Sequence, residues 1–413
     1  MKNPRNGVNR RDFIINIGAF GLGSTFALAG CKKEPEIVLQ AYPDESKGSY
    51  PQVPKRRLGK TDVKVPCLSH GIMYNLIENQ IVIHNALKWG INFIDTAHGY
   101  AGGNSELGVG KFFTKYPDRR DDIFIVSKAS GASSISEVEN RLQTSLKRMN
   151  TKYIDLYYGI HALSDPADLT DDLKKWVISA KNRKLIRHFG ISTHKNMAKC
   201  LMAVAKLDWI DAVMTSYNFR LMQNPEMQEA IEACHKADIG LIAMKIMGLK
   251  ISSDDDRKLI NKFRVKGYTD GQAKLKVVLD DSRIASACVT MPSVAMITTN
   301  ASAVIDKKRL SRKDRDILKD YAKSSCDHYC AGCADICSDD WSEAAPYISD
   351  IMRYLMYYNS YNEQEKAKIL FSKIPAQIRR GLMNNNYSEA EAKCPQKIPI
   401  KSMISEAVEK LAS

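Results

Sequence analysis

Short apolar runs alternate with longer amphipathic stretches through residues 56–305. The runs predict strands near Leu68–Met73, Asn92–Thr96, Ile123–Ser127, Ile154–Gly159, Arg187–Ser192, Ala212–Tyr217, Gly240–Lys245 and Ala287–Met291. The stretches between them have the periodicity of surface helices. This repeated β–α order is typical of a parallel sheet covered by helices. Eight such units over about 250 residues predict an α/β fold, a (β/α)8 TIM barrel.

The pattern changes on both sides of the predicted barrel. Residues 31–55 are rich in proline and charge and have no apolar period, which predicts a tether. Residues 306–413 begin with charged helical sequence and continue as a Tyr-rich helical region that holds five of the ten cysteines. We expect this region to form a separate small C-terminal domain, since its length alone allows an independent fold.

Residues 1–30 are interpreted as a targeting segment. Arg10 and Arg11 precede Phe13 and a Gly-rich apolar stretch from Ile15 to Ala27. This pattern resembles a twin-arginine signal peptide, with which bacteria export proteins already folded around a cofactor. The four residues that end in Cys31 resemble a lipobox, which implies that Cys31 is diacylated. The apolar stretch is shorter than the ~20 residues of a spanning helix, so a lipid anchor in the periplasm or cell envelope is favoured over a transmembrane one.

The chain is basic, with 61 Lys and Arg against 47 Asp and Glu and a formal net charge of +14. Charge of this size could favour acidic substrates or an anionic membrane surface. The basic residues are nevertheless spread along the chain with acidic residues between them, which indicates solvated helix faces. No nucleic-acid-binding motif is present, so nucleic acid is not an expected partner.

Four polar residues occur at the ends of three successive predicted strands. Asp95 ends one apolar run and Tyr100 lies five residues later, Lys128 ends the next run, and His161 comes directly after the third. In a parallel barrel these positions face one pocket. We expect Lys128 to lower the pKa of Tyr100 from roughly 10, Asp95 to keep Lys128 charged, and His161 to polarise a carbonyl oxygen.

These residues, in this order, resemble the Asp, Tyr, Lys, His tetrad of the aldo-keto reductases, and Asn104–Gly108 matches the segment after the Tyr in that family. The resemblance implies hydride transfer between a nicotinamide coenzyme, NAD(P), and a carbonyl or alcohol carbon. Arg57–Val65 resembles the hairpin that closes the barrel bottom in that family. The coenzyme contacts implied by the resemblance are Ser192, Thr193, Tyr217, Lys245, Pro292 and Asn300.

Two positions depart from the family pattern. Met214 stands where the family usually has Gln, which puts one amide contact in question. No basic residue lies between Pro292 and Asn300, where the family usually grips a 2′-phosphate. The choice between NAD and NADP is therefore open.

Four cysteines fall within twelve residues, from Cys326 to Cys337. Such clustering favours disulfides, zinc or an iron-sulfur cluster. The spacing Cys330-x2-Cys333-x3-Cys337, with a distant Cys394 before Pro395, resembles a single-cluster ferredoxin arrangement. It also resembles the iron-sulfur tail of one branch of the aldo-keto reductases. The resemblance implies a [4Fe-4S] cluster held by these four cysteines. Because the x3 spacing departs from the usual x2, Cys326 is a spare that could replace one ligand. The remaining cysteines of the barrel are expected to be packing residues: Cys67, Cys200, Cys234 and Cys288.

Taken together, these patterns predict a membrane-tethered aldo-keto oxidoreductase that acts on a small carbonyl or sugar substrate. Free nicotinamide coenzyme is expected to be scarce outside the cytoplasm. The coenzyme would therefore be bound tightly and recycled within one turnover cycle, or the cluster would pass electrons to an external redox partner. Two alternatives are a non-catalytic binding or electron-transfer lipoprotein and a redox-neutral enzyme with tightly bound NAD(P).

Overall fold

The computed structural model describes residues 50–248, 267–324, 326–337, 343–361 and 363–412. The predicted signal segment, Cys31 and most of the predicted tether lie outside these residues. Within the described ranges, no helix combines the length and apolarity needed to cross a bilayer. Ordered contacts begin before the predicted start at residue 56, because Val53 is buried and its amide donates to the carbonyl of Trp89 at 2.9 Å.

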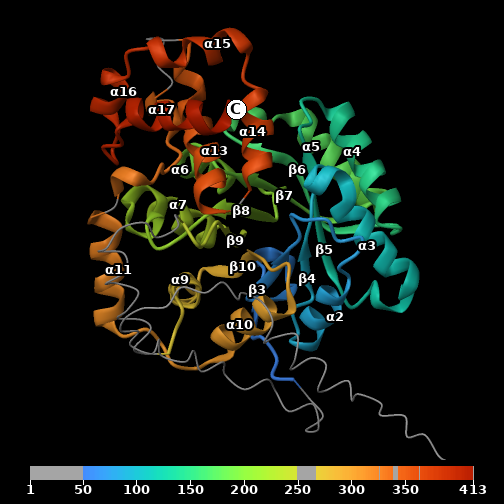
Figure 1. Cartoon of the computed structure of the whole chain (residues 1–413). Helices are drawn as coiled ribbons and strands as arrows, with labels where there is room; N and C mark the ends of the chain where they lie inside the picture. The colour runs from blue at the N-terminus through green and yellow to red at the C-terminus, as the bar shows by residue number, and fades with distance from the viewer. Residues whose placement is uncertain (1–49, 249–266, 325, 338–342, 362, 413) are drawn as a thin grey trace, which may run out of the picture. The chain divides into compact units, whose positions relative to one another are not determined.

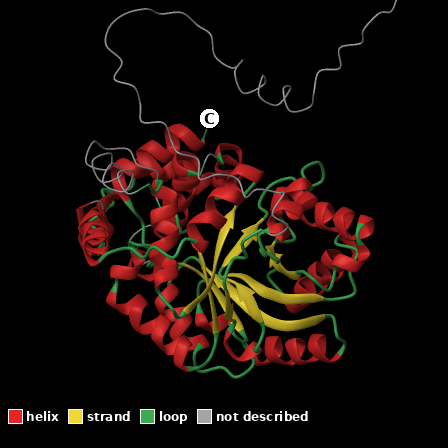
Figure 2. Ribbon diagram, turned by 90° about the horizontal axis from the view of Figure 1, so that it is seen from below, coloured by secondary structure: helices red, strands yellow, loops and turns green. Residues whose placement is uncertain are grey.

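Eight parallel strands form a closed barrel in the order β10-β3-β4-β5-β6-β7-β8-β9. The strands are β3 (Leu68–Gly71), β4 (Phe93–Asp95), β5 (Phe124–Ser130), β6 (Ile154–Leu163), β7 (Ile186–Thr193), β8 (Ala212–Ser216), β9 (Gly240–Met244) and β10 (Ile284–Thr290). Figure 2 shows them at the centre of a ring of helices. The predicted (β/α)8 barrel is therefore confirmed, and its last strand begins three residues earlier than expected.

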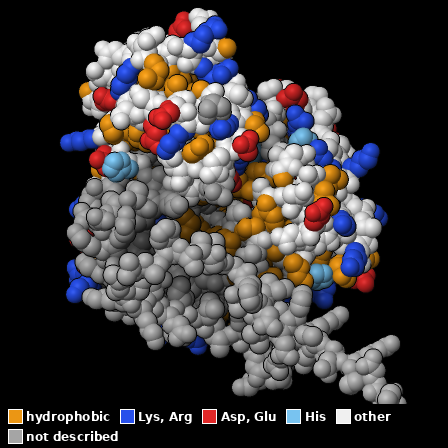
Figure 3. Space-filling view, viewed as in Figure 1, with side chains coloured by type: hydrophobic (Ala, Val, Ile, Leu, Met, Phe, Trp, Pro, Cys, Tyr) orange, Lys and Arg blue, Asp and Glu red, His pale blue; other side chains and the backbone are white. Residues whose placement is uncertain are grey.

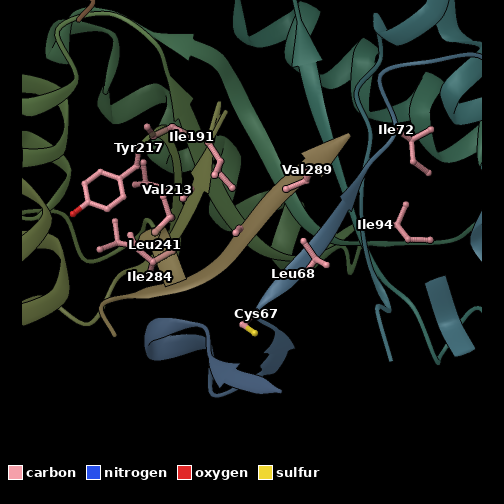
Figure 4. Close-up of a cluster of buried hydrophobic side chains, with 14 of the residues drawn as sticks. Cys67, Leu68, Ile72, Ile94, Ile191, Val213, Tyr217, Leu241, Ile284 and Val289 are labelled. Atoms are coloured by element: carbon pink, nitrogen blue, oxygen red, sulfur yellow. The ribbon is translucent and has the colours of Figure 1, made fainter. Parts of the chain in front are cut away.

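Helices lie between the strands in sequence and surround the outside of the barrel. They are α2 (Ile81–Lys88), α3 (Asn104–Lys115), α4 (Ile135–Arg148), α5 (Asp171–Asn182), α6 (Met197–Val204), α7 (Pro225–Lys236), α9 (Asp270–Asp280) and α10 (Val294–Ile305). Several begin with a side-chain cap that the sequence supplies, such as Ser134 before α4 and Thr170 before α5. Their apolar faces cover the strands, and Figure 4 shows part of the resulting core, including Leu68, Ile94 and Val213.

A hairpin closes the end of the barrel that lies opposite the carboxyl ends of the strands. Its strands β1 (Lys55–Arg57) and β2 (Lys64–Pro66) pair antiparallel. Leu58 and Val65 from this hairpin pack against the side chains that fill the barrel interior, among them Phe93. Because the interior is a packed core, we expect chemistry at the mouth formed by the carboxyl ends of the strands.

The residues after the barrel form a set of helices that we call the tail, residues 306–412. They are α11 (Arg312–Ser324), α12 (Ala334–Cys337), α13 (Ile348–Ser360), α14 (Gln364–Ser372), α15 (Ala376–Gly381), α16 (Ser388–Lys393) and α17 (Ile400–Leu411). A second hydrophobic core runs from Cys337 to Leu411. Leu318, Tyr321 and Tyr329 belong to the barrel core instead. The first part of the tail thus packs as an extension of the barrel. Figure 1 shows α13 and α14 beside the carboxyl ends of the strands.

Candidate active site at the barrel mouth

The four residues predicted for proton transfer lie at the carboxyl ends of three neighbouring strands. Asp95 ends β4, Lys128 lies on β5 and His161 lies on β6. Tyr100 begins the short turn Tyr100–Gly103 that comes after β4. Because β4, β5 and β6 are parallel neighbours, the fold brings these side chains to one part of the mouth.

Lys128 and Asp95 form a buried ion pair. The Lys128 ammonium donates to the two carboxylate oxygens of Asp95 at 2.6 and 2.7 Å and to the carbonyl of Thr96 at 2.7 Å. An ammonium has three N–H donors, so these partners use all of them. Lys128 is 1% exposed and Asp95 is 2% exposed. Burial raises the pKa of Asp95, and the neighbouring ammonium acts in the opposite direction.

The phenol of Tyr100 stays in its protonated form. Lys128 Nζ lies 4.7 Å from the centre of the Tyr100 ring. Burial raises the pKa of Tyr100 well above 10, and the charge of Asp95 acts in the same direction. The sequence-based expectation of a lowered pKa is therefore wrong for this arrangement, because burial of the phenol and the negative charge of Asp95 both favour the protonated form. A protonated phenol at this position can donate a proton.

His161 is neutral at physiological pH. Burial lowers its pKa to about 3, and the positive charge of Lys128 adds to the effect. Its Nδ1 lies 3.0 Å from the hydroxyl of Ser130, and its ring centre is 6.1 Å from that of Tyr100. When Ser130 donates to Nδ1, the ring carries its proton on Nε2, where it can be donated to a carbonyl oxygen.

The segment after Tyr100 braces the turn that carries the phenol. Glu106 is fully buried and accepts from the Ser127 hydroxyl at 2.6 Å and from Arg148 at 3.2 Å. Arg148 also donates to the carbonyl of His98 at 2.8 Å. Gly103 has φ +99°, and a Cβ there would lie 2.7 Å from the guanidinium carbon of Arg148. The matched residues Asn104–Gly108 therefore support the site without entering it.

Cys288 is a neighbour of the tetrad that the sequence analysis assigned to packing. It lies on β10, and the Cys288 thiol and the Asp95 carboxylate each act on the pKa of the other. Burial and the nearby charge of Asp95 raise the pKa of this thiol. A lone cysteine in an apolar strand carries no signal of such a contact, because the contact depends on the closure of the barrel between β10 and β3.

The residues predicted to bind the coenzyme fall into two groups. Ser192 and Asn300 are buried, and within the described chain the Ser192 hydroxyl has no hydrogen-bond partner. Thr193 donates to the carbonyls of Leu163 and Lys195, and the Tyr217 hydroxyl donates to Asp281 at 2.7 Å. Figure 4 shows the Tyr217 ring among the buried apolar side chains. Pro292 is exposed in the connection between β10 and α10. Thr193 and Tyr217 are thus already engaged within the protein, whereas the Ser192 hydroxyl is available to a ligand.

Lys245, the remaining predicted coenzyme contact, meets the tail. Its ammonium donates to the Tyr357 hydroxyl of α13 at 2.6 Å. The tail also contacts the mouth where the Asn218 amide donates to the Tyr329 hydroxyl at 2.9 Å. Sequence analysis treated the tail as a separate domain and did not find these contacts. Residues of the tail that lie at the mouth are therefore part of the candidate site.

Cysteines of the tail line a small cavity, the cysteine cavity. Its lining includes Cys330, Cys333, Cys337 and Cys394. Burial raises the pKa of Cys333 to about 12, and negative charge on Cys330 or Cys394 acts in the same direction. In the part of the chain that the structure describes, the cysteines form no disulfide. No three His, Cys, Asp or Glu side chains among those residues are arranged to hold a single metal ion.

Comparison with known proteins agrees with this fold. The sequence pattern of the aldo/keto reductase family matches residues 74–295, a range that contains all four tetrad residues. The chain belongs to the aldo/keto reductase family.

Among curated proteins, the chain is similar to the aldo-keto reductase yakc of Schizosaccharomyces pombe, whose name specifies NADP(+). The identity is 28% over 218 residues, which are 48% of this chain and 62% of that protein. It is also 28% identical over 155 residues to the oxidoreductase YqkF of Bacillus subtilis, covering 34% of this chain and 48% of that protein. The chain thus matches less than two thirds of the length of these relatives.

Solved structures share the barrel. The holo form of an aldo-keto reductase from Bacillus halodurans gives a TM-score of 0.54 at 21% identity, covering 65% of this chain and 96% of that one. An aldo-keto reductase from Klebsiella pneumoniae in complex with NADPH gives 0.54 at 20% identity, covering 65% and 94%. At these identities the likeness shows the fold. The tail lies outside residues 74–295, the range that matches the family.

Proposed function

We propose that the chain is an NAD(P)-dependent oxidoreductase that transfers hydride between the coenzyme and a small carbonyl or alcohol substrate. The observation that carries the proposal is the meeting of Asp95, Tyr100, Lys128 and His161 at the barrel mouth. One protonated phenol, one neutral imidazole and one buried ion pair are what a carbonyl reduction needs for proton transfer and polarisation.

The residues at the mouth fit a nicotinamide coenzyme, which would supply a hydride to the carbonyl carbon when bound. The buried and unpartnered hydroxyl of Ser192 can bond with an amide such as a carboxamide. Lys245 directly follows β9, Pro292 lies between β10 and α10, and Asn300 lies in α10. NADP is favoured, because similar proteins are described with NADP(+) or NADPH.

Each tetrad residue has a distinct role in the proposed reduction. Tyr100 donates a proton to the oxygen of the substrate, and its raised pKa keeps that proton on the phenol until then. His161 donates a hydrogen bond to the same oxygen from a ring that stays neutral. The Lys128 ammonium lies 4.7 Å from the centre of the Tyr100 ring and stabilises the phenolate as it forms. Asp95 holds the ammonium in place, and its own negative charge opposes part of this effect.

The direct test is turnover of a carbonyl substrate with the purified chain and NADPH, measured as loss of absorbance of the reduced coenzyme. Tyr100→Phe should lower kcat by about 10²- to 10⁴-fold, because a positioned acid contributes that much. Coenzyme binding, measured by fluorescence titration, should stay within a few-fold of the unsubstituted protein. Wild-type turnover by Tyr100→Phe would exclude the assigned proton donor. Product analysis without added coenzyme tests the redox-neutral alternative.

We also propose that Cys330, Cys333, Cys337 and Cys394 hold a [4Fe-4S] cluster. The thiolates of such a cluster surround it on several sides and do not converge on one ion, and these four residues share the lining of one cavity. Positive iron would also offset the burial that raises the pKa of the thiols. Cys326 does not line the cavity, in keeping with its role as a spare.

Iron content tests the cluster. Protein purified anaerobically should contain about four irons per chain if the site holds one [4Fe-4S] cluster. Cys394→Ser should lower the iron content and Cys326→Ser should not. Iron-free protein with paired cysteines would show that they form disulfides instead, and zinc in place of iron would exclude the cluster equally.

Export and anchoring are proposed from the sequence of residues 1–31. Arg10 and Arg11 would direct the folded protein through twin-arginine export, and lipid on Cys31 would hold it at the membrane. Cys31→Ser should move the protein from the membrane to the soluble periplasmic fraction. Membrane retention of that variant with a diacyl group attached would contradict the proposal.

A further inference from the structure

A cavity of about 440 Å³ lies between the barrel mouth and the tail. The barrel contributes His194, Ser216 and Lys245 from the ends of β7, β8 and β9, and the tail contributes Arg353 of α13 and Lys410 of α17. This volume falls within the range of small-molecule sites, about 300–1,000 Å³. Figure 1 shows α13 and α17 on the side of the carboxyl ends of the strands.

The charge inside the cavity is positive and is only partly balanced. The Lys245 ammonium has the Tyr357 hydroxyl as its hydrogen-bond partner and makes no ion pair with any carboxylate of the described residues. Burial lowers the pKa of Lys245, and the charge of Arg353 lowers it further. A buried cation is costly unless an anion pairs with it. An anion in this cavity would remove that cost.

The carboxylates of the tail near the cavity are already paired with other cations. Glu363 binds Lys366 at 2.7 Å. Asp350 accepts from both Lys195 and Arg353. A third pair joins Glu406 to Lys410 at 2.6 Å. Arg353 and Lys195 share the single carboxylate of Asp350. The cavity therefore keeps an excess of positive charge after these pairs are counted.

The same cations influence the pKa of the catalytic histidine. Lys245, Arg353 and Lys366 all act on the pKa of His161 and on that of His194. His194 lines the cavity and His161 belongs to the tetrad. The positive charges at the cavity therefore act on the cavity wall and on the reacting groups alike. The cavity wall also carries hydroxyl and amide groups suited to a polyol: Ser216, Ser349, Asn359 and Ser360.

We propose that Lys245 and Arg353 bind the anionic group, a carboxylate or a phosphate ester, of a polyhydroxylated substrate whose carbonyl lies between Tyr100 and His161. This inference rests on the proposed function and narrows its substrate class to sugar acids or sugar phosphates. Lys245 and Arg353 would then determine specificity, and Arg353 would come from the tail and not from the barrel.

The experiment compares two matched aldoses, D-glucuronate and D-glucose, which differ by a carboxylate in place of a hydroxymethyl group. Arg353→Gln and Lys245→Met should each lower kcat/KM for D-glucuronate by at least about 10-fold, the loss from an unpaired charge contact. For Arg353→Gln the value for D-glucose should change less than about 3-fold. Lys245→Met is not compared on D-glucose, because Lys245 is also a candidate coenzyme contact. Lys245→Arg should restore most of the loss because it keeps the charge. Arg380→Gln, at an exposed arginine of the tail, is the control and should behave as wild type.

Binding of inorganic phosphate, measured by calorimetry without coenzyme, needs no turnover. We expect saturable binding to the wild type and at least about 10-fold weaker binding to Arg353→Gln and Lys245→Met. Protein that shows this pattern but reduces no carbonyl keeps the anion site and refutes the proposed function. Protein that reduces aldehydes but binds no phosphate and does not prefer D-glucuronate refutes the anion site alone.

Two other outcomes would overturn the assignment. A larger effect of the substitutions on KM for NADPH than on KM for NADH would show that the cations bind the 2′-phosphate of the coenzyme. Equal losses for D-glucuronate and D-glucose in Arg353→Gln would show a structural role for Arg353. Melting temperatures of all variants within a few degrees of the wild type exclude unfolding as the cause.

Discussion

The buried pair of Lys128 and Asp95 allows a quantitative test of how the site is held together. Lys128→Met removes the cation and leaves the Asp95 carboxylate, 2% exposed, without its two short charge-assisted bonds. Breaking a buried pair by removing one partner costs about 3–5 kcal/mol. We therefore expect Lys128→Met to lower the free energy of unfolding at pH 7 by about that amount.

The double variant Lys128→Met with Asp95→Asn removes both charges. Its free energy of unfolding should be about 1–3 kcal/mol higher than the value obtained by adding the two single effects, because the two groups act as one unit. The measurement is urea denaturation at pH 7 monitored by circular dichroism, with the four proteins of the cycle treated alike.

The pH dependence gives a second test of the same pair. Burial raises the folded-state pKa of Asp95, and loss of Lys128 raises it further. The folded variant then binds a proton that the unfolded chain releases near pH 4, so the stability of the variant rises as pH falls. The deficit of Lys128→Met against wild type should therefore shrink between pH 7 and pH 5. A cost below about 1 kcal/mol, additive effects, or a deficit independent of pH would refute the argument.

Three further outcomes are expected from the geometry of the site. Gly103→Ala, which would place a Cβ 2.7 Å from a guanidinium, should lower both kcat and the melting temperature. Gly102→Ala, with no atom within 4 Å, should show only the backbone cost of about 1–2 kcal/mol. Ser130→Ala should lower kcat about 10-fold, because it removes the hydroxyl that keeps the ring proton of His161 on Nε2. Burial lowers the pKa of His70 to about 4, so stability should fall as pH drops from about 6.5 to 4, by about 3 kcal/mol from this residue, and less in His70→Gln.

The barrel could be predicted from the sequence because its signal is local. Each strand is an apolar run bounded by polar residues, and each tetrad residue stands at the end of such a run, as Asp95 and Lys128 do. The topology of a parallel barrel then places those ends together without further information. What the sequence could not give is the direction in which the pKa of Tyr100 shifts, since that depends on how deeply the phenol is buried and how close it lies to the charge of Asp95.

Contacts between distant segments were also beyond the sequence. Cys288 meets Asp95 only because the barrel closes, and Lys245 meets Tyr357 across more than a hundred residues. Figure 3 shows Lys and Arg interspersed with Asp and Glu on the described part of one face. The proposed specificity depends on positive charge inside the cavity. The composition of the chain does not show which basic residues lie there.

The position of Arg353 links the two parts of the chain. It lies on α13, whose buried face, including Met352 and Leu355, belongs to the hydrophobic core of the tail. Cys330 lines both the cysteine cavity and the cavity that holds Lys245 and Arg353. Because assembly of a metal site is coupled to folding, a tail without the proposed cluster would hold Arg353 less firmly beside Lys245. Iron content and the preference for anionic substrates should then fall together, while the buried pair that supports Tyr100 stays intact in the barrel.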